Sequence, residues 1–482
     1  MTSGLRAAMA ALVIACSTAA RAAAGGDTPL VDAARAGDAA AVRALLAGRV
    51  DVQQAQGDGS TALHWAVHRD DLPIVDALLR AGARANAVTD LGATPLYLAC
   101  TNHSAAMVSR LLEAGADPNL SLPTGETALM NCARTGDAAA VRALVARGAR
   151  VDARESAHQQ TALMWAAANG HPGVVRELLS AKADLRTRST VYSQVVTSEV
   201  TQRAGREALN YTVRRGGSTP LLFAARSGDA ESARLLLAAG ADPNDALADG
   251  LPALTLAAYS GHGAVAGVLL ERGADPNAAA IGFTALHAAV LRSDAALVRT
   301  LLARGANPNP AMTRGTPMRR TSQDFDLPAA LIPATPLLLA ARFLEPDIVR
   351  ALRAGGADAG ALMADGTTAL MLAAGLGASA TQDRRGVALI DGGRRASEEL
   401  VLQTVDAVLE AGGNPRATNQ AGDTALHAAA AGGLDRVVSR LVAAGAVLNP
   451  KDGRGRTPLG AIAARADRRA TADLLRSLGA IE

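Results

Sequence analysis

The sequence predicts an all-α solenoid, a stack of about twelve two-helix layers that occupies most of the 482 residues. Composition is the first reason: 49% of the residues are hydrophobic, yet only 2% are aromatic. Thin layers of stacked helices can close around small aliphatic side chains, whereas a thick globular interior usually needs large ones. The second reason is a repeat. The tripeptide Thr-Pro-Leu or Thr-Ala-Leu recurs every 33 residues, at Thr28, Thr61, Thr94 and Thr127.

The first 24 residues predict a secretory signal peptide. Arg6 precedes a short apolar stretch and a run of small residues, so we expect cleavage close to Ala24 and a repeat array over residues 26–482. The sequence Val-Ile-Ala-Cys that ends at Cys16 also resembles a bacterial lipobox, which makes a lipid anchor the alternative. A third interpretation is a cytoplasmic protein with a misleading apolar start. No apolar stretch reaches the ~20 residues of a transmembrane helix, so we expect a periplasmic or secreted protein.

The repeat continues to the end of the chain. In the copy at residues 217–244, Thr219 can cap a first helix, Pro220 has its φ already set for a first turn, and Gly228 can end that helix. A single copy exposes apolar faces, so only stacking can close the core. The later copies start at Thr161, Thr219, Pro252, Thr284, Thr335, Thr368, Thr424 and Thr457.

The segment GSTPLLFAARSGDAESARLLLAAGADPN, residues 217–244, resembles the ankyrin repeat, and the resemblance covers nearly all of the chain after the leader. It implies that each copy folds as a helix, a tight turn, an antiparallel second helix and a hairpin loop. It also implies a protein-protein interaction scaffold that uses its concave face and its hairpin loops. With its leader, the chain resembles the exported ankyrin-repeat proteins of bacteria.

Three longer gaps interrupt the period and predict insertions near residues 187–216, 310–333 and 376–397. The first two fall where hairpin loops are expected, and the third falls between the two helices of its copy. The first insertion carries Tyr192 and Tyr211, so it is a candidate contact element; packing over the groove and an idle flap are the alternatives. The third insertion, mostly Gly, Ala and charged residues, is interpreted as tolerated surface chain.

The resemblance implies that a partner meets the exposed ends of the first helices, seven and eight residues after each Thr. Arginine occupies this place in seven copies, which predicts a partner with an acidic surface. The alternative is structural, because a cation in the last turn of a helix offsets the macrodipole. The candidate binding residues, with the two tyrosines of the first insertion, are Arg69, Asn102, Arg134, Asn169, Arg226, Tyr259, Arg292, Arg342, Phe343, Tyr192 and Tyr211.

The sequence carries no catalytic motif and no paired-Cys zinc spacing, so we expect neither an enzyme nor a metal or cofactor. An enzyme or toxin-like activity in the insertions, or a host-directed ankyrin effector, is the alternative. His64, His287 and His427 stand at a place where, in the ankyrin family, the His supports the loop. A net charge of only +3 indicates no nucleic-acid partner, and we expect a monomer.

Cys100 and Cys132 lie on adjacent predicted first helices. Because neighbouring helices lie ~8–10 Å apart and a disulfide needs Cα atoms within ~7 Å, we expect two buried thiols.

Overall fold

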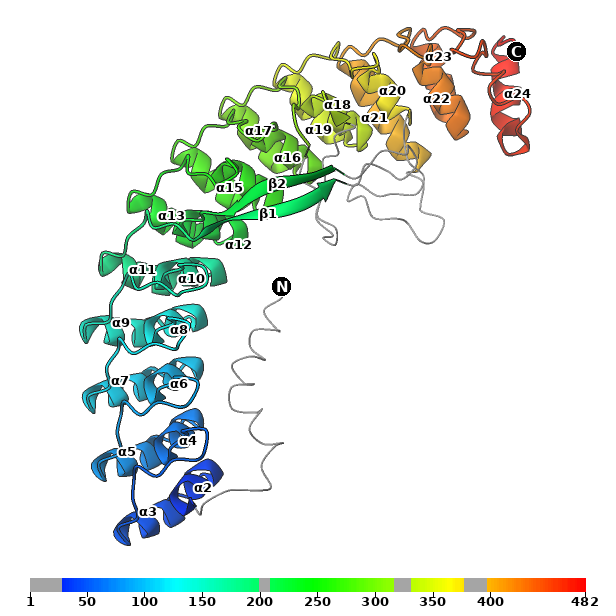
Figure 1. Ribbon diagram of the computed structural model, residues 1–482. Coiled ribbons are helices and arrows are strands. Elements are labelled where there is room, and N and C mark those ends of the chain that lie inside the picture. Colours follow the sequence, from blue (N-terminus) through cyan, green and yellow to red (C-terminus); the bar gives the residue numbers. More distant parts are fainter. Residues whose placement is uncertain (1–27, 199–208, 316–330, 377–396) are drawn as a thin grey trace. The chain divides into compact units, whose positions relative to one another are not determined.

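The computed structural model describes residues 28–198, 209–315, 331–376 and 397–482 (Figure 1). The predicted signal peptide, with Cys16, lies outside these residues. The chain forms two compact units. Unit 1 comprises residues 1–191 and 216–242, and unit 2 comprises residues 192–215 and 243–482.

Unit 1 is a stack of helix pairs, as the period predicts. In Figure 1 the first helices of the pairs lie on one side of this stack and the second helices on the other. The first helices are α2 (Pro29–Ala36), α4 (Ala62–His68), α6 (Pro95–Thr101), α8 (Ala128–Thr135), α10 (Ala162–Asn169) and α12 (Pro220–Ser227). The second helices are α3 (Ala39–Ala47), α5 (Leu72–Arg80), α7 (Ala105–Glu113), α9 (Ala138–Ala146), α11 (Pro172–Ser180) and α13 (Ala230–Ala238).

Unit 2 repeats the same construction. Its pairs are α14 (Ala253–Ser260) with α15 (Gly263–Glu271), α16 (Ala285–Leu291) with α17 (Ala295–Ala303), α18 (Pro336–Arg342) with α19 (Pro346–Ala354), α20 (Ala369–Ala373) with α21 (Glu398–Glu410), and α22 (Ala425–Gly432) with α23 (Asp435–Ala443).

The last copy departs from the expected pair. The stretch after Thr457, residues 458–464, forms turns instead of a first helix, and only η3 (Ala466–Arg468) and α24 (Arg469–Ser477) follow. Gly460 stands where the first turn of that helix would be, and glycine is among the poorest helix formers.

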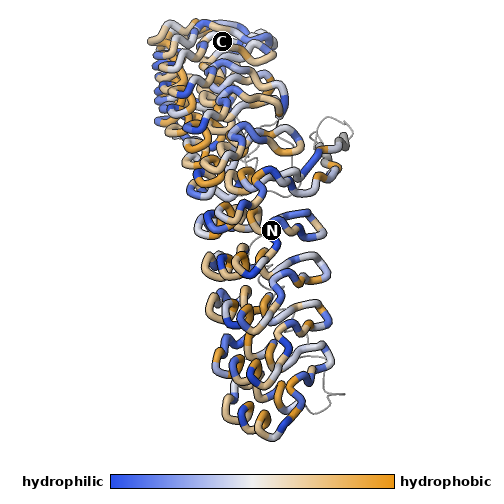
Figure 2. Tube along the Cα trace, turned by 90° about the vertical axis from the view of Figure 1, so that its left-hand side faces the viewer, coloured by the Kyte–Doolittle hydropathy of each residue, from blue (hydrophilic) through white to orange (hydrophobic). Residues whose placement is uncertain are grey.

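The core is aliphatic, and it lies between successive layers. Within unit 1, α4 packs against α2 and α6, while α5 packs against α3. Leu63, Leu129 and Leu163 of the first helices and Leu144 of a second helix are fully buried or nearly so. Figure 2 shows hydrophobic residues recurring in every layer of helices. The aliphatic composition therefore builds the thin layers that it predicted.

The first insertion adds an element that the helical pattern does not predict. Strands β1 (Val191–Ser198) and β2 (Leu209–Gly216) pair as a two-stranded sheet. Most of the second predicted insertion and nearly all of the third fall at 316–330 and 377–396, outside the described residues.

Candidate binding surface

Most first helices are capped at their start by the threonine of the repeated tripeptide; in α14 Pro252 stands in its place, and Thr28 of α2 makes no side-chain cap bond. The Thr127 Oγ1 accepts the backbone N–H of Met130 at 3.3 Å, and the Thr219 Oγ1 accepts that of Leu222 at 3.4 Å. Such a cap satisfies one of the N–H groups that the helix leaves open. Where the Thr is a cap, it therefore fixes the residue at which the first helix begins, and with it the position of the residues at the far end of that helix.

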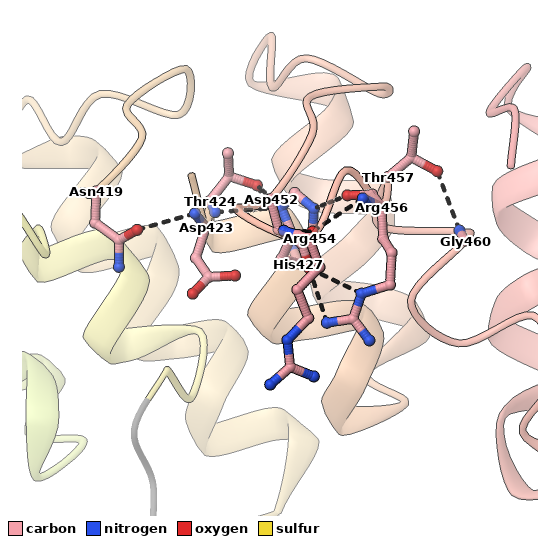
Figure 3. Close-up of polar contacts among 9 residues, drawn as sticks. All are labelled: Asn419, Asp423, Thr424, His427, Asp452, Arg454, Arg456, Thr457 and Gly460. Atoms are coloured by element: carbon pink, nitrogen blue, oxygen red, sulfur yellow. Dashed lines mark hydrogen bonds and ion pairs between the residues drawn. The ribbon is translucent and has the colours of Figure 1, made fainter. Parts of the chain in front are cut away.

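Three copies add a histidine to this cap. The Nδ1 of His64 lies 2.8 Å from the Thr61 Oγ1, and its Nε2 lies 3.1 Å from the carbonyl oxygen of Ala93 in the next layer. His427 repeats the arrangement with Thr424 and the carbonyl of Arg456 (Figure 3). The expected loop-supporting role is confirmed for His64 and His427; His287 makes the contact with its cap, Thr284, at 2.9 Å. Burial lowers the pKa of His64, so it stays neutral in this role.

The hairpin loops are tied together by asparagine. The Asn119 amide donates to the carbonyl of Gly148 at 3.0 Å, while its Oδ1 accepts the N–H of Arg150 at 2.8 Å. Asn86 makes the same two bonds to Gly115 and Asp117. In the sequence, Asn119 stands in an Asp-Pro-Asn segment, which by itself indicates only a turn. The bridging role was missed because both partners lie about one repeat further along the chain.

We use "first-helix face" for the residues seven and eight positions after each N-cap. Three of the predicted site residues on this face donate to carbonyls at the end of the preceding first helix. Arg69 donates to Arg35 (3.4 Å), Asn102 to Val67 and His68 (2.7 and 3.0 Å), and Arg292 to Ser260 (3.0 Å).

Such terminal carbonyls have no partner inside their own helix. These three contacts therefore support the helix-end role, and they extend it from a residue's own helix to the layer before it.

Glycine makes this contact between layers possible. Gly37, at φ +75°, ends α2 directly beneath the Arg69 guanidinium. A Cβ on this glycine would lie 2.7 Å from the Arg69 Nη2. Gly37 therefore allows both the left-handed backbone at the helix end and the close approach of the next layer.

The other predicted residues of unit 1 on this face are Arg134, Asn169 and Arg226. Asn169 and Arg226 are exposed, and the Asn169 amide donates to the Trp165 carbonyl at 2.7 Å. Arg134 is half-buried; its Nη2 donates to the Asn131 Oδ1 at 2.6 Å, and its guanidinium carbon lies 5.7 Å from the centre of the Trp165 ring. These residues stand at the ends of successive first helices, α8, α10 and α12.

In unit 2 the predicted residues are partly withdrawn from solvent. Burial lowers the pKa of Arg342, and Phe343, which follows α18, is half-buried. The Tyr259 ring packs against Phe283 with 6.4 Å between ring centres.

The two tyrosines of the first insertion lie on different strands. Tyr192 on β1 is 52% exposed, and Val195, three residues further along the strand, is 67% exposed. Tyr211 lies in β2, and its side chain is outside the described part. Arg215 lies within 3.9 Å of Asp249 and thereby links β2 to a loop of unit 2.

Comparison with known proteins identifies the family of the repeat. A family model of three consecutive ankyrin repeats matches residues 30–122, 96–189, 199–280, 221–312 and 395–481. The chain belongs to the ankyrin repeat family. Among solved structures, the crystal structure of the human ASB11 ankyrin repeat domain is similar: it is 29% identical and matches over 52% of this chain and 100% of its own, with a TM-score of 0.42. No curated protein matches the chain.

One prediction about this ankyrin array is wrong. Cys100 and Cys132 form a disulfide, with their Cα atoms 4.6 Å apart. The expected ~8–10 Å is a separation of helix axes, but Cα atoms lie ~2.3 Å from each axis, so residues that face each other come much closer. The bond joins the first helices α6 and α8 of adjacent repeats, and both residues are fully buried.

Among the described residues, no group of His, Cys, Asp and Glu side chains could hold a metal ion. Of the helices in the described ranges, none is long and apolar enough to cross a membrane.

Proposed function

We propose that this ankyrin protein is an exported scaffold that binds a protein partner along the first-helix face and the adjoining hairpin loops, outside the cytoplasm. The ankyrin fold supports the general role of protein-protein interaction. The observation that carries the finer proposal is the set of exposed or part-exposed polar side chains at the ends of α8, α10 and α12 in unit 1, held on a fixed helical frame. Rigid presentation lowers the entropy that binding costs.

The disulfide supports export. Disulfides persist in oxidising compartments and are rare in the reducing cytosol of mesophiles. The bond between Cys100 and Cys132 therefore agrees with the leader-like start of the sequence. Mass spectrometry of the mature protein from its native host tests this part. A chain that starts near Gly25, or at an acylated Cys16, supports export, and an unprocessed Met1 contradicts it.

The binding face is tested by site-specific photo-crosslinking in the native host. A crosslinking residue replaces exposed Asn169 at the end of α10, and a matched control replaces exposed Ser180 at the end of α11 in the same layer. We expect discrete adducts with a protein from position 169 and few from position 180. Equal labelling from both positions contradicts the proposed face.

A further inference from the structure

The two tryptophans of the protein, Trp65 and Trp165, stand in equivalent places of unit 1, four residues after the N-cap threonine. Each lies beneath an arginine from the preceding first helix. The guanidinium carbon of Arg35 is 5.8 Å from the Trp65 ring centre, and that of Arg134 is 5.7 Å from the Trp165 ring centre. The chain thus contains the same cation–π pair twice.

The first pair carries its own carboxylate. Asp32 lies 3.0 Å from the Arg35 Nη2. Its Oδ1 also accepts from the Gln56 Nε2 at 3.4 Å, and the Gln56 Oε1 accepts the indole N–H of Trp65 at 3.2 Å. The arginine and the indole are therefore both linked to one acid, directly or through one amide.

The second pair lacks that acid. The residue four positions after its N-cap is Asn131, which is neutral and whose amide already donates to Tyr97 and Thr101. The Arg134 Nε and the Trp165 Nε1 are both shielded from solvent, and neither has a hydrogen-bond acceptor.

The neighbouring acid does not replace the missing one. The Glu126 carboxylate accepts the Tyr97 hydroxyl at 3.0 Å. Across the described ranges, no carboxylate lies within 4.0 Å of the Arg134 guanidinium. Leaving two shielded N–H donors without an acceptor costs free energy.

We propose that Arg134 and Trp165 form a carboxylate-binding site, where an acidic group of the protein partner supplies the charge that Asp32 supplies in the first pair. This inference rests on the proposed function, because it assumes a partner at the first-helix face. The part-exposed Arg134 side chain meets the carboxylate at its outer end. Rotation about its side-chain bonds then turns Nε towards the acid and uncovers the indole N–H.

Tryptophan fluorescence tests the site directly. The variant Trp65→Phe leaves Trp165 as the only tryptophan, and its emission is followed at low ionic strength as peptides are added. A hexaglutamate peptide capped at both ends presents side-chain carboxylates, and an acetylated triglycine with a free C-terminus presents a terminal carboxylate. A saturable change with either supports the site and identifies the source of the carboxylate. A change with neither, or an equal change with capped hexaglutamine, overturns the proposal.

Two variants assign the response to the named groups. In the Trp65→Phe background, Arg134→Gln is expected to weaken peptide binding about tenfold or more, since it removes the charge-assisted bonds. Asn131→Asp places a carboxylate where the first pair has one, and it is expected to block the response. If this second variant does not fold, as judged by circular dichroism, Arg134→Gln still tests the proposal. Unchanged binding in Arg134→Gln overturns the proposal.

The reciprocal variant is the matched control. Trp165→Phe leaves Trp65, whose arginine is already paired with Asp32, and its emission is expected to stay constant when the peptides are added.

The crosslinking experiment at Asn169 does not depend on carboxylate binding by Arg134 and Trp165. Adducts there without a peptide response would refute the carboxylate site alone, whereas a peptide response without adducts would refute the proposed binding face.

Discussion

Arginines on the two faces of unit 1 differ in their partners. On the second helices, two arginines pair with an acid of a neighbouring layer: Arg110 Nε lies 2.5 Å from Asp76, and Arg142 Nη2 lies 2.5 Å from Glu177. On the first-helix face, Arg69 donates to a backbone carbonyl, and Arg134 lies over Trp165. In the described part of the chain, no acid lies within ion-pair distance of these two.

This difference teaches which face can attract a partner. A positive charge that is already paired with a carboxylate has little left to offer an incoming acid. On the first-helix face Arg35 is paired with Asp32, whereas Arg69 and Arg134 have no ion pair and use some of their N–H groups in hydrogen bonds within the stack.

The two faces differ only in their surface side chains, so the core beneath both faces should be equally important for stability. Leu129 of α8 and Leu144 of α9 are almost fully buried in one layer. We expect Leu129→Ala and Leu144→Ala each to lower the free energy of unfolding by about 2–5 kcal/mol, because each leaves a cavity. Urea denaturation measures both. A loss for one helix but not the other would show that the layer is not a shared core.

The disulfide joins first helices only. Removing it in the double variant Cys100→Ser, Cys132→Ser is expected to cost about 3 kcal/mol of unfolding free energy, because the bond closes a long loop of the unfolded chain. Thiol alkylation with mass spectrometry, before and after reduction, measures whether the bond exists. Two freely alkylated thiols in the native oxidised protein would contradict it.

Low pH should also destabilise the protein through His287, a buried residue of the first helix α16. Burial lowers the pKa of His287 to about 4, whereas the unfolded chain has the ordinary value near 6.5. Between these values the unfolded state binds a proton that the folded state does not, so stability falls as pH drops from about 6.5 to 4.

The loss from His287 is on the order of 2–3 kcal/mol. Unfolding free energies of the wild type and of His287→Gln, measured across this pH range, test it. The variant should show a shallower dependence, and parallel curves would contradict the assignment.

The smallest effect is expected on the second-helix face. Arg110 and Asp76 are partly exposed, so Arg110→Ala should change the unfolding free energy by at most about 1 kcal/mol. It should leave partner capture unchanged. A loss of partner capture in this variant would contradict the proposed face and indicate that the partner binds the second helices.

Local features of the fold could be predicted from the sequence. A Thr cap, a Pro in the first turn and a terminating Gly act within a few residues, so the positions of the helix pairs follow from the repeated tripeptide. The turn structure after Thr457 is an exception, where Gly460 weakens the expected helix.

Contacts between layers could not be predicted in the same way. The disulfide depended on which residues of two helices face each other, not on the spacing of their axes. The Asn119 bridge and the Arg134–Trp165 pair each join residues about one repeat apart, and their hydrogen bonds depend on side-chain directions that spacing does not reveal. The sequence predicted Arg134 as a binding residue, and the structure adds the indole beneath it.

Partner capture by charge-reversed proteins tests the central claim most directly. The partner identified by crosslinking is presented to Arg134→Glu, Arg226→Glu on the first-helix face and to Arg142→Glu, Arg176→Glu on the second helices, after circular dichroism has shown that both double variants fold. We predict that the first loses at least about tenfold in affinity while the second binds as the wild type does. Equal binding by both, or a loss only in the second, would contradict the account.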